Sequence, residues 1–263
     1  MYYNIFRSII MFSLLCNFSF ALDGGGGLVQ GHAVVIEMPD DDVQKLINPN
    51  LELKKHNRTN KNTHQVLLLF FSFKNVGPII NNRTPKIGLN YNSLYFLIPH
   101  VGFPWSAHQH YSVLPIGLMS SRLMTYASSK FSGLNKIHTD ITWDKSSFTS
   151  YEWNNLMTSK LLVVARFNQL RLAKKSELTK VINLVNMPIL SDKPRGSGFF
   201  GTSSAKVDWD NSELLHEHCK ITFTQRFFQK IENQEEEIKK LNYETKNCFY
   251  FNSTFSVGKF TPL

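Results

Sequence analysis

The chain has 263 residues, of which 42% are hydrophobic, and it carries a formal net charge of +9. This length fits one large domain or two small ones, and the hydrophobic content is enough to bury a core. The basic residues are spread along the chain and do not gather in a stripe with interleaved aromatic residues, which argues against a nucleic-acid-binding protein.

The first 21 residues have the three parts of a secretory signal peptide. The positive charge of Arg7 precedes an apolar run from Ile9 to Phe20, which ends at Ala21. This run is shorter than the roughly 20 residues that a membrane-spanning helix needs, and four glycines follow soon after it. We therefore expect export to a periplasm or out of the cell, a mature chain that begins at Leu22, and no membrane span after cleavage.

The remaining sequence predicts one mixed domain dominated by sheet. We expect a flexible glycine-rich leader at residues 22–32 and a single domain at residues 33–263. Apolar runs and period-2 alternation predict strands, and helical spacing with acidic residues at the start predicts helices. The predicted strands are 33–37, 51–53, 66–73, 90–98, 161–167 and 221–227, and the predicted helices are 43–47 and 229–241. The predicted loops are 54–63 and 191–204. The segment 117–129 is ambiguous.

Two cysteines remain once the signal peptide, with its own Cys16, is removed. Cys219 and Cys248 would be in an oxidising compartment, so we expect them to form one disulfide. The bridge would close a loop of about 30 residues and stabilise the fold by about 3 kcal/mol. The alternative is a pair of buried free thiols.

Histidines give weak metal-binding signals. His216 and His218 would share one face of a strand, which is usable ligand spacing. A third ligand would have to come from His108, His110 or His138, and no spacing rule links them to the pair. We therefore assign no metal.

Known cofactor and nucleophile motifs are absent from the sequence. It contains neither the glycine-rich phosphate loop that ends in lysine nor the Gly-x-Ser-x-Gly elbow of hydrolases, so we assign no cofactor. The aromatic, histidine-rich loop at residues 102–110 either lines a ligand pocket through Trp105 or is simply packed.

Several segments, taken in chain order, resemble the acetoacetate decarboxylase superfamily. The resemblance covers roughly residues 34–167. It includes the early helix with its proline-containing turn, the apolar strand after it, a tyrosine strand that ends in Ile-Pro, and a lysine-containing segment before a glycine. These segments are Ile47–Leu53, His64–Phe70, Tyr91–Pro99, and Leu114–Pro115 with Tyr126–Gly133.

This resemblance implies a cone-like or barrel-like, mainly antiparallel sheet with flanking helices, and a site near Tyr91. In the family, a lysine amine forms a Schiff base with a β-keto acid, and its pKa must be lowered for this. At the aligned nucleophile position this chain has Ser129, and Lys130 matches the neighbouring lysine. The expected glutamate is replaced by Ser93.

These replacements favour an exported decarboxylase-like protein that binds a small carboxylate or keto compound without Schiff-base decarboxylation. The expected ligand-binding residues are Tyr91, Ser93, Trp105 and Ser129. One alternative is an active carbon–carbon lyase that uses Lys130 as a shifted nucleophile. Another is a secreted interaction protein that uses its basic surface.

Overall fold

The computed structural model describes residues 25–54, 62–78, 88–106, 109–132, 134–153, 159–191, 201–210, 212–231, 241–258 and 261–262. At 78, 127, 129–132, 153 and 261–262 it describes the backbone only. The signal peptide expected at residues 1–21 lies outside these ranges, and so does most of the helix expected at 229–241. Within them, no helix is both long and apolar enough to cross a bilayer.

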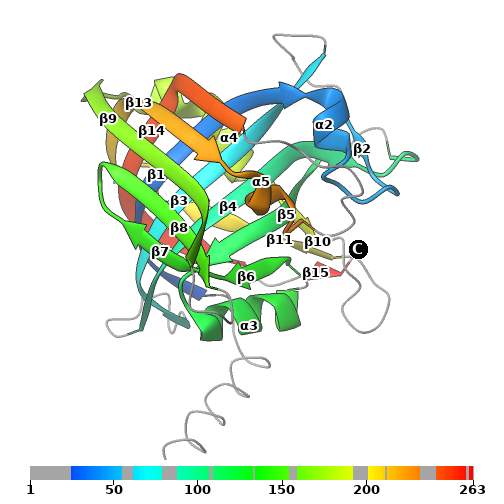
Figure 1. The fold of residues 1–263 in the computed structure, drawn as a ribbon, viewed down its shortest axis with the longest axis horizontal. Coiled ribbons are helices and arrows are strands. Elements are labelled where there is room, and N and C mark those ends of the chain that lie inside the picture. Colours follow the sequence, from blue (N-terminus) through cyan, green and yellow to red (C-terminus); the bar gives the residue numbers. More distant parts are fainter. Residues whose placement is uncertain are drawn as a thin grey trace, which may run out of the picture.

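One large sheet dominates the structure (Figure 1). Its strands are β1 (Gly25–Pro39), β2 (Glu52–Leu53), β3 (Thr63–Pro78), β4 (Leu89–Gly102), β5 (Tyr111–Met119), β6 (Lys136–His138), β7 (Asp140–Trp143), β8 (Ser147–Trp153), β9 (Ser159–Leu172), β10 (Ile189–Ser191), β11 (Gly201–Ser203), β12 (Ala205–Val207), β13 (Glu213–Phe223), β14 (Leu241–Val257) and β15 (Thr261–Pro262). Along the sheet they follow the order β15-β11-β10-β5-β4-β3-β1-β14-β13-β9-β8-β7, with β2, β6 and β12 attached beside this path. The pairs are antiparallel, except that β6 and β10 each run parallel to β5.

Short helices flank the sheet. They are α2 (Asp40–Gln44), α3 (Arg122–Ser132), the 3₁₀ helix η1 (Lys175–Leu178), α4 (Thr179–Val185) and α5 (Gln225–Phe228). Helix α3 packs against β5 and β6, whereas α4 packs against β1 and β3. The sheet-dominated α+β domain that the sequence predicts is confirmed, although the sheet has two free ends and does not close into a barrel.

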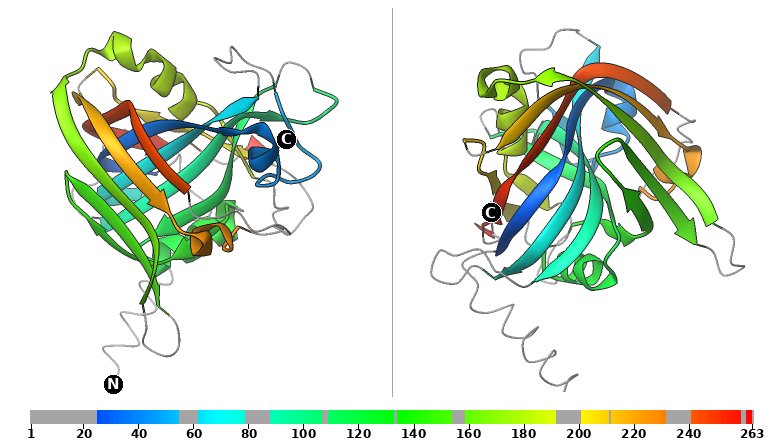
Figure 2. Two further views of the ribbon diagram at one scale, coloured as in Figure 1. Left: turned by 45° about the horizontal axis from the view of Figure 1, so that its top comes forward. Right: turned by 90° about the vertical axis from the view of Figure 1, so that its left-hand side faces the viewer.

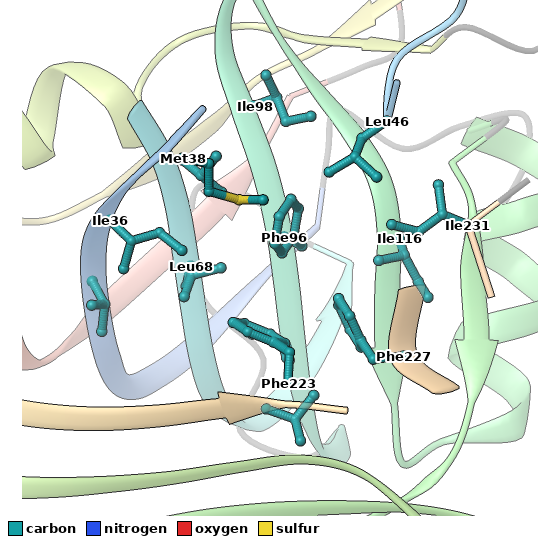
Figure 3. Close-up of a cluster of buried hydrophobic side chains, with 14 of the residues drawn as sticks. Ile36, Met38, Leu46, Leu68, Phe96, Ile98, Ile116, Phe223, Phe227 and Ile231 are labelled. Carbon is teal, nitrogen blue, oxygen red and sulfur yellow. The ribbon is translucent and has the colours of Figure 1, made fainter. Parts of the chain in front are cut away.

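The sheet curls so far that side chains from distant strands touch. In the sheet, β3, β1 and β14 separate β4 from β13. Nevertheless, the ring centroid of Phe96 in β4 lies 5.8 Å from that of Phe223 in β13 and 5.8 Å from that of Phe227 in α5. Figure 2 shows the resulting half-closed cone, and Figure 3 shows these rings among the aliphatic side chains around them.

Both faces of the central strands are buried, as the apolar run at 66–73 predicts. Alternate residues of β3 contribute to two separate cores: Phe70 points into one and Phe71 into the other. We call the first the inner core, because the sheet curls around it; its members include Val34, Phe70, Phe96, Phe167 and Phe223. The outer core includes Leu69, Phe71, Tyr91, Val181 and Phe251.

We expected a flexible leader at residues 22–32, but β1 already begins at Gly25. It pairs with β14 on one side and with β3 on the other. Glycine suits this segment because the neighbouring backbone comes very close. A Cβ atom at Gly31 would lie only 2.1 Å from the carbonyl oxygen of Phe70. The glycines therefore allow tight strand pairing, in a segment whose composition suggested a loop.

Three other boundaries differ from the sequence predictions. β4 continues through Pro99, whose carbonyl oxygen lies 2.6 Å from Nε2 of His64 in β3. The strand expected at 221–227 stops at Phe223, and α5 begins at Gln225. The ambiguous segment 117–129 divides into the end of β5 and most of α3.

Candidate functional site

Strand β4, which carries the family resemblance, places Tyr91, Ser93 and Tyr95 on one face, since alternate residues of a strand share a face. Tyr91 and Ser93 are buried, with relative exposures of 7% and 0%, and Tyr95 is half-buried. On the neighbouring strand β3, Phe73 pairs with Tyr91 and Phe71 pairs with Ser93. Two phenols and a hydroxyl therefore share aromatic surroundings on the outer-core face.

Lys136 of β6, which no sequence motif marks, adds a positive charge to this face. Its Nζ lies 3.5 Å from the hydroxyl oxygen of Tyr95, 3.3 Å from Oγ of Ser128 in α3, and 4.7 Å from the centre of the Tyr95 ring. Such a cation above an aromatic face is attractive. We call Tyr91, Ser93, Tyr95 and Lys136 the tyrosine–lysine site.

The register of three strands explains why Lys136 reaches Tyr95. Tyr95 pairs with Gly117 of β5, and Gly117 in turn pairs with Lys136. A Cβ atom at Gly117 would lie 3.1 Å from Cγ of Lys136 and 3.3 Å from Cδ1 of Tyr95. Because glycine has no Cβ, the two longer side chains meet across it.

The groups of this site differ in charge and in hydrogen bonding. Burial raises the pKa of Tyr91 well above its usual value, and the adjacent Tyr95 adds to the shift. Tyr91 is therefore a neutral phenol at neutral pH, able to donate a hydrogen bond. Oγ of Ser93 has no hydrogen-bond partner among the described residues, although buried polar atoms usually have one.

Helix α3 brings the expected lysine segment close to this site. Ser128 contacts Lys136 directly, and Ser129 and Lys130 follow it in the same helix. The side chains of Ser129 and Lys130 are outside the described part of the chain. Their roles in binding and catalysis therefore stay predictions.

Trp105, also expected to bind a ligand, lies away from the tyrosine–lysine site. Tyr91 is near the start of β4, whereas Trp105 follows the end of that strand at Gly102. The Trp105 side chain is 78% exposed and stacks on Phe103, with the ring centroids 4.7 Å apart. The structure thus separates Trp105 from Tyr91 and Ser93.

The expected disulfide is corrected by the structure, in which Cys219 and Cys248 are free, buried thiols. The register of β13 and β14 pairs Cys248 with Glu217 and Cys219 with Thr245, so the cysteines are not directly opposite each other. Burial raises the pKa of the Cys248 thiol well above its usual value, and the nearby Cys219 and Glu217 raise it further. Both results fit the alternative of two buried thiols.

The two histidines considered as weak metal ligands have other partners. Nε2 of His216 lies 2.6 Å from the carbonyl oxygen of Lys246, and Nε2 of His218 lies 3.0 Å from the Glu244 carboxylate. Both imidazoles are half-buried, whereas Glu217 between them is buried on the opposite face of β13. Within the described ranges, neither histidine belongs to a cluster suited to a metal ion.

No protein-family model matches the sequence, and no curated protein is similar to it. The similarity appears in solved structures, which include two acetoacetate decarboxylases and an acetoacetate decarboxylase-like enzyme. The chain thus has the acetoacetate decarboxylase-like fold, which confirms the resemblance seen in residues 34–167.

Three of these structures illustrate how far the similarity extends. Acetoacetate decarboxylase from Legionella pneumophila has a TM-score of 0.60 and 11% identity, over 95% of both chains. A second acetoacetate decarboxylase has a TM-score of 0.58 and 10% identity, over 93% of this chain and 91% of the other. The enduracididine biosynthesis enzyme MppR complexed with pyruvate has a TM-score of 0.53 and 9% identity, over 92% of this chain and 91% of the other.

Proposed function

We propose that the protein is an exported acetoacetate decarboxylase-like protein that binds a small carboxylate or keto compound without Schiff-base decarboxylation. The observation that carries this proposal is the tyrosine–lysine site. It combines the Lys136 ammonium group, the neutral phenol of Tyr91 and the unpartnered hydroxyl of Ser93 in apolar surroundings. A few polar groups in an apolar setting are typical of small-ligand sites.

The replacements at the family's catalytic positions support binding without imine chemistry. An imine requires an amine nucleophile with a lowered pKa. The aligned position is Ser129, whose hydroxyl cannot form an imine, and the carboxylate expected on β4 is replaced by Ser93. A ligand carboxylate would instead accept hydrogen bonds from Lys136 and the hydroxyl groups.

A keto acid is the ligand class that we favour. MppR, which has a similar fold, has been solved in complex with pyruvate. Pyruvate carries one carboxylate and one carbonyl group, and the cation and hydroxyl donors of the tyrosine–lysine site would suit both. Pyruvate is therefore the probe that we choose for binding experiments.

Replacing Lys136 should weaken pyruvate binding. We expect Lys136→Met to weaken it by about 10- to 100-fold, because a hydrogen bond to a charged group contributes about 1.5–3 kcal/mol. Isothermal titration calorimetry of the wild-type and variant proteins measures this difference. Lys220→Met is the matched control, since Lys220 is an exposed lysine on β13. Equal pyruvate affinity in the Lys136→Met and wild-type proteins, or no binding by the wild type at millimolar pyruvate, would contradict the proposal.

The exposure of Trp105 favours a second candidate, a secreted interaction protein. The Trp105 side chain is 78% exposed, and tryptophan is enriched among the residues that contribute most to protein–protein binding. Because Trp105 lies away from the tyrosine–lysine site, Trp105→Ala should leave pyruvate affinity unchanged. A Trp105→Ala protein that loses pyruvate affinity would place Trp105 in the ligand site after all.

Export is part of the proposal and rests on the pattern of residues 1–21. We expect secreted material to begin at Leu22, because signal peptidase reads the small residues Ser19 and Ala21 before the cut. N-terminal sequencing of exported protein tests this expectation. A mature protein that retains Met1, or one that begins far downstream of Leu22, would rule it out.

A further inference from the structure

Three neighbouring strands bring a histidine, a glutamate and a cysteine together on the inner-core side of the sheet. The order of these strands is β1, β14, β13. Cys248 of β14 pairs with Glu217 of β13 on one side and with Val34 of β1 on the other, and His32 lies two residues before Val34. The three side chains come from distant parts of the sequence, and none of them belongs to the tyrosine–lysine site.

Their donor atoms lie within reach of one metal ion. Nδ1 of His32 is 2.6 Å from Oε2 of Glu217, and Sγ of Cys248 is 3.7 Å from the same oxygen. All three donor atoms lie within 4.8 Å of one another. The residues are 0%, 3% and 0% exposed, respectively.

Without a metal, this cluster keeps polar groups in an apolar place. The His32 ring stacks on Phe167, with centroids 3.6 Å apart and planes at 3°, and Tyr250 and Trp143 lie nearby. Within the described part of the chain, Nε2 of His32 has no hydrogen-bond partner. Burying a carboxylate and an imidazole in this way is costly unless their hydrogen bonds and charges are satisfied.

We propose that His32, Glu217 and Cys248 form a binding site for a zinc-class divalent ion that links β1, β13 and β14. Imidazole nitrogen, carboxylate oxygen and thiolate sulfur are the ligand types that Zn²⁺ prefers in proteins. One thiolate and one carboxylate balance the two positive charges of the ion, so the bound cluster is neutral overall. The metal displaces the Cys248 thiol proton to solvent. It also takes the place of the proton between His32 and Glu217, so that His32 binds through Nδ1 as a neutral imidazole with its proton on Nε2.

Small side-chain movements would place the three donor atoms at three corners of a tetrahedron, which leaves the fourth position for a water molecule. Zinc bonds of about 2.0–2.3 Å place tetrahedral ligand atoms about 3.3–3.8 Å apart. The contact between His32 and Glu217 at 2.6 Å must therefore open slightly, and any separation close to the limit of 4.8 Å must shorten. Rotation about side-chain bonds supplies such changes without moving the strands.

This site lies on the opposite face of the sheet from the tyrosine–lysine site. Tyr91 belongs to the outer core, whereas Cys248 belongs to the inner core. The metal site therefore does not depend on the proposed ligand function. We assign it a structural role: by mass action, an ion that binds only the folded state stabilises that state.

Cobalt spectroscopy of the whole protein under reducing conditions tests the site directly. We expect the wild-type protein to bind one equivalent of Co²⁺ with a thiolate-to-cobalt charge-transfer absorption and tetrahedral ligand-field bands. Zn²⁺ should remove these bands by competition and should raise the melting temperature. A folded, reduced wild-type protein that shows no charge-transfer band at saturating Co²⁺ would overturn the proposal.

Variants identify the ligands. Cys248→Ser should lose the charge-transfer band. His32→Phe keeps a ring to stack on Phe167 but has no ligand atom, so it should weaken Co²⁺ affinity at least about 100-fold. This loss is larger than is usual when a residue only hydrogen-bonds to a metal ligand. His218→Gln is the matched control, because its side chain lies on the opposite face of β13 from Glu217, and it should keep wild-type affinity. Full Co²⁺ affinity in His32→Phe, or a band that disappears in His218→Gln, would refute the assignment.

Discussion

Replacing Phe96 by alanine should lower the free energy of unfolding by about 3–5 kcal/mol, the usual range for a buried phenylalanine. Phe96 is fully buried at 0% exposure, and its ring meets those of Phe223, Phe227 and Phe228. The variant leaves a cavity where β4 touches β13 and α5 across the curled sheet. Denaturant unfolding measures the loss, and in thermal unfolding the midpoint should fall by roughly 10 °C.

The control for this experiment is Leu172→Ala on β9, whose side chain is 74% exposed. An exposed substitution of this kind should change the free energy of unfolding by less than about 0.5 kcal/mol. If Phe96→Ala were as mild as Leu172→Ala, the contact between β4 and β13 would not exist, and the sheet would not curl as described.

Gly31→Ala should cost about 3 kcal/mol of stability, the upper end of the usual range for overpacking, although alanine adds a single methyl group. The new Cβ atom would lie 2.1 Å from the carbonyl oxygen of Phe70 and 2.7 Å from Cδ1 of Phe71, so β1 and β3 would have to separate. Chemical denaturation with circular dichroism as the readout measures this loss.

A second glycine of the same strand gives the matched control. At Gly25 an added Cβ atom would make an ordinary contact of 3.5 Å with the carbonyl oxygen of Gly77. Gly25→Ala should therefore change stability little. Equal effects of the two substitutions would mean that the close pairing of β1 with β3 is not what selects glycine at position 31.

Local sequence patterns predict the strand content well but not the strand ends. The apolar run 66–73 lies within β3, and the tyrosine strand lies within β4. The glycine-rich start of β1 and the passage of β4 through Pro99 escape such patterns. Both depend on pairing with strands that are distant in the sequence, and glycine and proline composition alone favours a loop there.

The candidate site could be predicted only in part, for the same reason. Tyr91 and Ser93 follow from the alternation of one strand and the family resemblance. Lys136 could not be found, because it lies in a three-residue strand without a motif and reaches Tyr95 only through the register of β4, β5 and β6. Gly117, an isolated glycine in an apolar strand, was the one available signal of a close approach.

The His32 cluster illustrates the limit of sequence reasoning most clearly. The spacing of His216 and His218 is local and therefore visible in the sequence, whereas Glu217 between them is the residue that joins a buried cluster. For Cys248 the sequence offers only cysteine number and compartment as guides, and these predict a disulfide. Only the order of β1, β14 and β13 reveals that His32 lies beside both.

Borohydride trapping tests most directly whether this fold acts here without Schiff-base chemistry. The mature protein is incubated with acetoacetate or pyruvate and reduced, and its peptides are mapped by mass spectrometry, while carbon dioxide release is followed in parallel. We predict no trapped adduct and no decarboxylation of acetoacetate above background, because the family resemblance aligns Ser129, which cannot form an imine, with the catalytic lysine. An adduct on Lys130 that disappears in Lys130→Ala would contradict this account and make the protein an active lyase with a shifted nucleophile.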